Sequence, residues 1–154
     1  MLSPLSLVRT EAVPAAAIRL TVSRDQIQEV MCPAITEVID AVLAQGIGPA
    51  GPLYTHHFRV DPDRFDFEVA VPISGPLQAV GRVVATETPA ADRVARVIYT
   101  GPYEGLEAAW GDFMGLIGEA GHQPGPNAWE SYLTDPADTP NPADHRTELN
   151  RPIL

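Results

Sequence analysis

The feature that most constrains the fold of this 154-residue chain is an internal repeat. Two helix-like segments, residues 24–45 and 103–120, each follow a strand-like segment, residues 15–22 and 94–100. Each helix-like segment ends at a glycine. A Gly-Pro turn, a further strand and an Asp-Pro pair then follow in the same order. Self-similarity of this length indicates one supersecondary unit that is used twice.

Several short markers carry the comparison of the two copies. The turns are Gly51-Pro52 and Gly125-Pro126, and the pairs that close the next strands are Asp61-Pro62 and Asp135-Pro136. A last strand completes each copy, where a glutamate precedes a proline by four residues: Glu68 before Pro72, and Glu148 before Pro152. The shared order predicts two β-α-β-β repeats, near residues 5–75 and 79–153.

The repeats predict an α+β fold, with an antiparallel sheet and two long helices in a single domain over residues 1–154. Duplicated units commonly pack around a pseudo-two-fold axis, and a cleft along that axis is a natural ligand site. We therefore predict two pseudo-symmetric repeats around a central ligand cleft.

The first helical segment is predicted in two pieces, because proline suits a first helical turn and breaks a helix interior. Residues 24–31 are expected to form a short turn of helix that begins at a capping box of Ser23 and Gln26. The main helix is then expected from Pro33 to Gln45.

The second helix is predicted over residues 103–120, and it carries Gly111, Gly115 and Gly118 on one side. Glycine lowers helix stability, so these positions suggest that another backbone passes close by. A merely weak helix is the alternative.

Charge and composition exclude several classes of function. The formal net charge is −10, and a surface of that sign repels phosphate backbones, so no nucleic acid partner is expected. No run of about 18 apolar residues and no basic leader occur, which predicts a soluble, cytoplasmic chain without membrane attachment. A single cysteine, Cys32, excludes an internal disulfide.

Metal and cofactor chemistry has little support in the sequence. The four histidines lack the spacing of a zinc site, and neither a phosphate loop nor a dinucleotide fingerprint occurs. We therefore predict neither a metal nor a cofactor.

Three motifs carry a family resemblance: Gly-Pro-Tyr-Glu at 101–104, Trp-Glu-Ser-Tyr-Leu-Thr-Asp-Pro at 129–136, and Thr-Glu-Leu-Asn-Arg-Pro at 147–152. With them the chain resembles the GyrI-like superfamily, the effector-binding domain of AraC- and MerR-type multidrug regulators. The resemblance implies a small-molecule-binding domain over nearly the whole chain. No helix-turn-helix or winged domain precedes the repeat, so we expect a stand-alone member.

The resemblance also implies roles for individual residues. Glu130 matches the buried pocket glutamate of the family, and Tyr132 matches its motif tyrosine. Tyr103 matches the tyrosine that begins the helix beside the cleft. The chain departs from the family at Trp129, where a basic or small residue is usual.

Strand geometry adds residues to this site. Side chains alternate along a strand, so Glu130 and Tyr132 share a face. Alignment of the two Asp-Pro pairs sets His56 opposite Glu130, with Tyr54 on the face of His56. An exposed strand residue in a surface salt bridge is the alternative for Glu130. The predicted ligand-binding set is Tyr54, His56, Tyr103, Trp110, Glu130 and Tyr132.

Three functions remain open at this point. The first is a binding protein for hydrophobic or cationic, drug-like small molecules, held by aromatic walls and one carboxylate. The second, which the resemblance implies, is a hydrolase that opens cyclopropane rings of DNA-alkylating compounds, with Glu130 activating a water. The third is interaction with a protein partner, either gyrase or a regulator.

Overall fold

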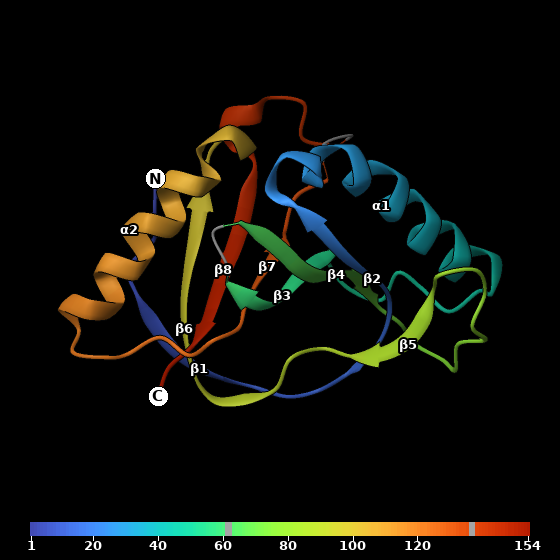
Figure 1. Ribbon diagram of the computed structural model, residues 1–154, viewed down its shortest axis with the longest axis horizontal. Coiled ribbons are helices and arrows are strands. Elements are labelled where there is room, and N and C mark those ends of the chain that lie inside the picture. Colours follow the sequence, from blue (N-terminus) through green and yellow to red (C-terminus); the bar gives the residue numbers. More distant parts are fainter. Residues whose placement is uncertain (61–62, 136–137) are drawn as a thin grey trace. The chain divides into compact units, whose positions relative to one another are not determined.

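The protein is described here by a computed structural model that covers residues 1–60, 63–135 and 138–154 (Figure 1). The predicted Asp61-Pro62 turn and the proline of the Asp135-Pro136 pair lie outside the described residues. The chain divides into two compact units. Unit 1 contains Met1–Thr10 and Ala91–Leu154, and unit 2 contains Glu11–Ala90. Each unit combines antiparallel strands with one long helix, which confirms the α+β fold.

Unit 2 contains four strands in the order β3-β4-β2-β5, with helix α1 packed on them. The bounds are β2 (Pro14–Ser23), a 3-10 turn (Arg24–Gln26), α1 (Ile27–Ala44), β3 (Tyr54–Val60), β4 (Arg64–Pro72) and β5 (Val84–Glu87). Alternate apolar residues of β2 and β4, among them Ile18, Phe67 and Val69, pack against Val38 and Val42 of α1. This face of the sheet is therefore the core of unit 2.

Unit 1 contains four strands in the order β1-β6-β8-β7, with helix α2 packed on them. The bounds are β1 (Ser6–Thr10), β6 (Ala91–Thr100), a 3-10 turn (Tyr103–Gly105), α2 (Leu106–Glu119), β7 (Ala128–Tyr132), a second 3-10 turn (Pro142–Asp144) and β8 (Arg146–Pro152). Val97 and Leu149 of the sheet meet Phe113 and Ile117 of the helix.

Both units follow the order strand, 3-10 turn, helix, strand, strand, as the repeat predicts. The outermost strands, β1 and β5, are exceptions, because each pairs with a strand that is not its neighbour in the repeat order. β1 pairs with β6 of unit 1, and β5 pairs with β2 of unit 2. The strand that comes before the β-α-β-β order of each unit in sequence therefore belongs to the other unit. The limits near residues 5–75 and 79–153 remain a prediction.

The predicted break in the first helix is wrong, because α1 runs without interruption and contains Pro33. The predicted capping box is wrong as well: the Ser23 hydroxyl donates to the Asp25 carboxylate at 2.6 Å and caps no backbone N–H. Residues before the proline, Ile27 and Met31, pack on the core of unit 2. Tertiary burial of this apolar face offsets the hydrogen bond that proline removes.

Replacing Pro33 by alanine is expected to stabilise the protein. Pro33 is exposed, and its ring removes the hydrogen bond to the Glu29 carbonyl without adding core contacts. Proline costs about 3 kcal/mol relative to alanine in a helix interior, and alanine returns up to about 1 kcal/mol of entropy to the unfolded chain. Thermal unfolding followed by circular dichroism should show a melting temperature higher by several degrees. A lower melting temperature would contradict this reading of α1.

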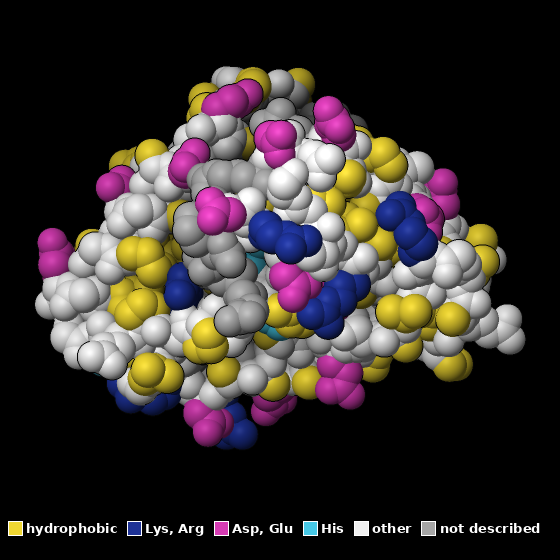
Figure 2. Space-filling view, viewed as in Figure 1, with side chains coloured by type: hydrophobic (Ala, Val, Ile, Leu, Met, Phe, Trp, Pro, Cys, Tyr) yellow, Lys and Arg dark blue, Asp and Glu magenta, His cyan; other side chains and the backbone are white. Residues whose placement is uncertain are grey.

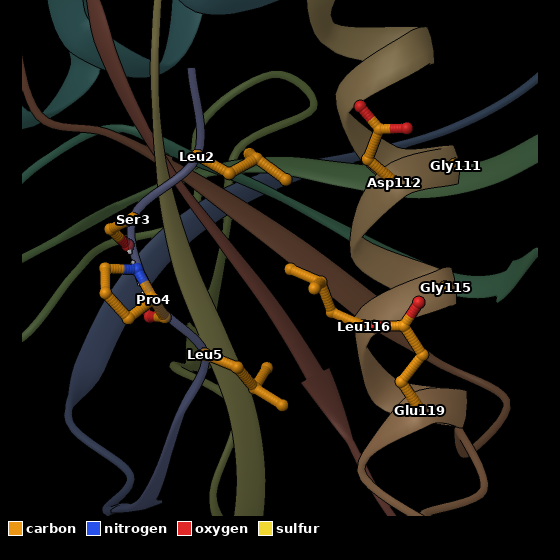
Figure 3. A pocket seen from close by; sticks show the side chains of 9 residues that line it. All are labelled: Leu2, Ser3, Pro4, Leu5, Gly111, Asp112, Gly115, Leu116 and Glu119. Carbon is orange, nitrogen blue, oxygen red and sulfur yellow. Dashed lines mark hydrogen bonds between the residues drawn. The ribbon is translucent and has the colours of Figure 1, made fainter.

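The predicted close approach at the glycines of α2 is also wrong. A Cβ added at Gly111, Gly115 or Gly118 would meet no atom within 4 Å outside the helix's own backbone. A groove of about 700 Å³ lies there instead, between residues 2–5 and the helix (Figure 3). Leu2, Leu5 and Leu116 border it. Gly111 and Gly115 line this groove, so at these two positions the missing side chains leave a hollow open rather than admit a second backbone.

On the face drawn in Figure 2, Asp and Glu side chains are scattered and do not gather in one patch.

Within the described residues, no helix has the length and apolarity needed to cross a membrane.

Candidate ligand site at Glu130

Glu130 projects from β7 toward α2. Its cross-strand partner on β8 is Leu149, which is fully buried against the helix, and cross-strand partners share a face of the sheet. Tyr132 follows two residues later and therefore lies on the same side, as predicted. Trp129 lies on the other face, opposite Asn150, and is buried.

Both carboxylate oxygens of Glu130 accept hydrogen bonds. Trp110 of α2 donates from Nε1 to Oε1 at 2.6 Å, and the Tyr132 hydroxyl donates to Oε2 at 2.9 Å. Bonds from neutral donors to an anion are stronger than neutral pairs, so they fix the carboxylate in one orientation. The predicted alternative, an exposed glutamate in a surface salt bridge, is not what the structure shows.

Burial raises the pKa of Glu130 above the usual value for glutamate, and the bonds from Trp110 and Tyr132 oppose this change only in part. Within the described part of the chain, Glu130 forms no salt bridge. A carboxylate that is withdrawn from water without a cation is poised to take up either a proton or a positively charged ligand.

Aromatic rings continue the site beyond Tyr132. The ring of Tyr103 meets Tyr132 edge-on, with centroids 6.1 Å apart and planes at 87°. On its other side Tyr103 stacks with His145 at 4.9 Å and 27°. Burial, with the nearby charge of Asp135 as the smaller cause, raises the pKa of Tyr103. The rings form a flat-walled surface of the kind that binds planar or cationic molecules.

The chain before α2 places Tyr103 through a tight local packing. The Tyr99 hydroxyl donates to the Pro102 carbonyl at 2.9 Å and fills the space under the turn that starts the helix. Gly101 has φ +152°, where a side chain is strained, and a Cβ at Gly105 would collide with the Tyr99 hydroxyl. Both glycines of the turn are therefore required by the position of Tyr99.

Gly105→Ala is expected to destabilise the protein by about 1–3 kcal/mol, the usual cost of overpacking. The added methyl group must displace Tyr99 or the turn that carries Tyr103. In a Tyr99→Phe background the colliding oxygen is gone, so the same substitution should cost much less. Urea denaturation of the wild type, both single variants and the double variant measures this coupling. Strict additivity of the two changes would contradict the packing described.

The two predicted site residues of unit 2, Tyr54 and His56, lie on β3. His56 pairs with Glu68 across the ladder, and its Nδ1 lies 3.7 Å from the Glu68 carboxylate. Tyr54 is buried among small alanines, and its hydroxyl has no hydrogen-bond partner within the described residues. Burial raises the pKa of this hydroxyl. Their membership in the ligand site remains a prediction.

The predicted correspondence of His56 with Glu130 does not hold in the ladders. His56 pairs with Glu68, whereas Glu130 pairs with Leu149, which follows Glu148, the counterpart of Glu68. The two residues therefore lie on different faces relative to the helix of their own unit.

A β-bulge explains the error. The register between β3 and β4 shifts between His57 and Arg59, which leaves Phe58 as one extra residue in the strand. Aligning β3 with β7 by counting residues back from the two Asp-Pro pairs therefore places the counterpart of Glu130 one residue too late, at His56. The counterpart of Glu130 in unit 2 is Thr55, which is buried and is the cross-strand partner of Val69 on β4.

Sequence reasoning did not find His145, which the structure brings to the site. No periodicity or motif marks this residue, since it precedes the third family motif and follows a 3-10 turn.

The structure also bears on cysteine, metal and histidine chemistry elsewhere in the chain. Cys32 is exposed, and the described residues contain no group of three or more His, Cys, Asp or Glu side chains that would hold a metal. His57 is partly buried and packs against the rings of Phe65 and Phe67; this burial, with His56 as the smaller cause, lowers its pKa to about 4.

A half-buried acid framed by aromatic rings offers chemistry suited to binding a small molecule. The family model of the GyrI-like small molecule binding domain matches residues 4–154, so this chain belongs to that family. The predicted family and binding class are thereby confirmed. A comparison with curated proteins finds no match.

Solved structures share the fold at low sequence identity. The EcmrR C-terminal domain superposes with a TM-score of 0.82 at 18% identity, covering 98% of this chain and 97% of that one. In the EcmrR–DNA complex (TM-score 0.81, 19% identity, 97% of this chain covered), this chain spans 57% of the EcmrR chain.

Two more distant structures are SAV2435 bound to tetraphenylphosphonium and a hydrolase encoded by lin2189 from Listeria innocua. The former has a TM-score of 0.64 at 9% identity, covering 99% of this chain and 94% of that one. The latter has a TM-score of 0.61 at 13% identity, covering 97% and 91%. At these identities the likeness concerns the fold alone.

Proposed function

We propose that this chain binds lipophilic cations at Glu130. The observation that carries the proposal is a half-buried carboxylate with a raised pKa, held by Trp110 and Tyr132 and without a salt bridge in the described residues. A cation that reaches this carboxylate supplies the missing counter-charge. The faces of nearby aromatic rings attract the same kind of ligand.

Structural neighbours support the choice of probe. SAV2435 was solved with tetraphenylphosphonium, a bulky aromatic cation. We extend that ligand class to this chain because Glu130 and the rings of Tyr103, Trp110 and Tyr132 offer the chemistry it requires.

The test compares a cation with a neutral molecule of similar bulk. Isothermal titration calorimetry should show tetraphenylphosphonium binding at least about tenfold more tightly than triphenylphosphine oxide, since a charged partner adds more than about 1.4 kcal/mol. Equal affinities would argue for a purely hydrophobic site. Absence of any binding would refute the proposal.

A hydrolase is the second candidate, and the raised pKa of Glu130 favours it because a general base works best when its pKa approaches the operating pH. Glu130 would take a proton from water as the water oxygen bonds to a cyclopropane carbon of an alkylating compound. The ring C–C bond to that carbon breaks, and its electron pair takes up a proton in the product. Incubation followed by mass spectrometry should then show a ring-opened, hydrated product. Recovery of intact compound after binding would leave the binding function alone.

A protein partner, gyrase or a transcriptional regulator, is the remaining proposal, and the net charge of −10 would suit a basic surface on such a partner. A pull-down with purified gyrase tests it. Retention that weakens as salt rises would support a contact through the net charge, and no retention at low salt would refute it.

The same charge predicts that the purified chain does not shift duplex DNA at physiological salt. A gel shift at micromolar protein that weakens as salt rises would contradict this.

A further inference from the structure

Two buried polar atoms at one end of the candidate site have no hydrogen-bond partner within the described residues. They are Nδ1 of His145 and Oγ1 of Thr147. His145 is 6% exposed and Thr147 is 0% exposed, so neither atom is satisfied by bulk water. Buried polar groups are normally paired, and each exception calls for a physical explanation.

The hydrogen bond at the other ring nitrogen defines what His145 offers. Nε2 lies 2.8 Å from the Thr139 carbonyl oxygen, which only accepts. Nε2 must therefore carry the proton, and in the neutral ring Nδ1 is an acceptor with a free lone pair. Nδ1 of His145 therefore lacks a hydrogen-bond donor within the described residues.

Both residues adjoin the side chains that frame Glu130. Thr147 is the cross-strand partner of Tyr132, whose hydroxyl bonds to Glu130. The His145 ring stacks on Tyr103, which meets Tyr132 edge-on. The two unpaired atoms therefore belong to the same face of unit 1 as the carboxylate.

We propose that His145 and Thr147 form an acceptor subsite that binds an N–H group of the ligand. This proposal rests on the proposed cation site and makes protonated amines the preferred ligands among the cations that bind there. The ammonium N–H is shared between Nδ1 of His145 and Oγ1 of Thr147 in a three-centre hydrogen bond, while the positive charge faces Glu130. A quaternary cation has no N–H and leaves both acceptors unpaired, which lowers its affinity.

The experiment uses a pair of probes that differ by one group. N,N-dimethyl-1-naphthylmethylamine is protonated near neutral pH, and trimethyl(1-naphthylmethyl)ammonium has a methyl group in place of the N–H. Calorimetric titration of the full chain should show a preference of about tenfold for the protonated amine.

Two variants then assign the preference. His145→Phe keeps a ring to stack on Tyr103, and Thr147→Val keeps the side-chain shape. In each variant, the preference should fall toward about one, because the protonated amine loses more affinity than the quaternary probe. His122→Phe is the matched control: it makes the same change beyond the far end of α2 and should keep the full preference. If His145→Phe does not fold, Thr147→Val decides.

The outcomes are distinguishable. If neither probe binds, the proposed cation site fails. If both probes bind wild type equally, the acceptor subsite is wrong. A preference that survives in both variants means that water fills these positions or that Glu130 receives the N–H, and it overturns the inference while the cation site stands.

Discussion

Glu130→Gln should weaken the binding of tetraphenylphosphonium by about 10- to 100-fold. The change keeps the shape of the side chain and removes its negative charge, so a cation loses an interaction of about 1.5–3 kcal/mol in a partly buried site. Calorimetric titration of wild type and variant gives the ratio directly. Under the hydrolase alternative, turnover should fall by about 10²–10⁴ while binding to the rings persists.

The matched control is Glu119→Gln, which removes the same charge at an exposed position at the end of α2. It should leave affinity within about twofold, the scale expected from screened surface charge. Equal affinity in Glu130→Gln and wild type would remove Glu130 from the centre of the site.

The raised pKa of Glu130 also gives binding a pH dependence of known sign. A cation pairs with the carboxylate, so affinity should rise with pH until the free site is deprotonated, and then level off. The Glu130→Gln variant should lack this rise. His145 and Tyr103 lie within the same group of rings and remain in the variant. If affinity still rises with pH in Glu130→Gln, the pH dependence belongs to these two residues.

Stability should follow the opposite trend. A carboxyl group whose pKa is raised in the folded state contributes stability that is fully present below the unfolded value, about 4.3, and lost as pH rises through the folded value. Glu130→Gln is therefore expected to be at least as stable as wild type near neutral pH. The difference should close in acid.

The sequence predicted those parts of the fold that short-range chemistry determines. The main helices end where Gly46 and Gly121 adopt φ values of +67° and +82°, conformations that favour glycine over other residues. Alternation along β7 sufficed to set Glu130 and Tyr132 on one face. Such features depend on a few neighbouring residues, so they are legible without the rest of the molecule.

Features set by distant contacts were missed. Pro33 stays inside α1 because the apolar residues around it pack on the sheet, and the bulge at Phe58 shifts a register that the sequence shows only as a spacing. The exchange of β1 and β5 between the two units is likewise a choice among strand partners. Local propensity carries no information about such choices.

The candidate site divides in the same way. The family motifs gave Glu130, Tyr132 and Tyr103, but the bond from Trp110 depends on how α2 lies over β7. His145 entered only through the structure, since its stacking on Tyr103 and its bond to Thr139 are both tertiary contacts.

Phe113→Ala should destabilise the fold by about 3–5 kcal/mol. Phe113 is fully buried between α2 and the sheet of unit 1, and its removal loses both transfer free energy and packing around the cavity. For a chain of this length, that loss lowers the melting temperature by roughly 6–20 °C. Urea denaturation with thermal melts as a second probe measures the effect. A loss below about 1 kcal/mol would mean that the neighbouring side chains close the gap.

Phe113→Ala should also weaken ligand binding in the molecules that remain folded. The ring centroids of Phe113 and Trp110 lie 5.5 Å apart, and the Trp110 indole orients the Glu130 carboxylate. Phe67→Ala provides the comparison: it removes an equally buried ring from unit 2 and should cost similar stability. Titrations at low temperature, where both variants are folded, should show weaker tetraphenylphosphonium binding for Phe113→Ala than for Phe67→Ala. Equal weakening in both would mean that affinity follows general stability, and then the packing of Phe113 on Trp110 would have no specific part in positioning Glu130.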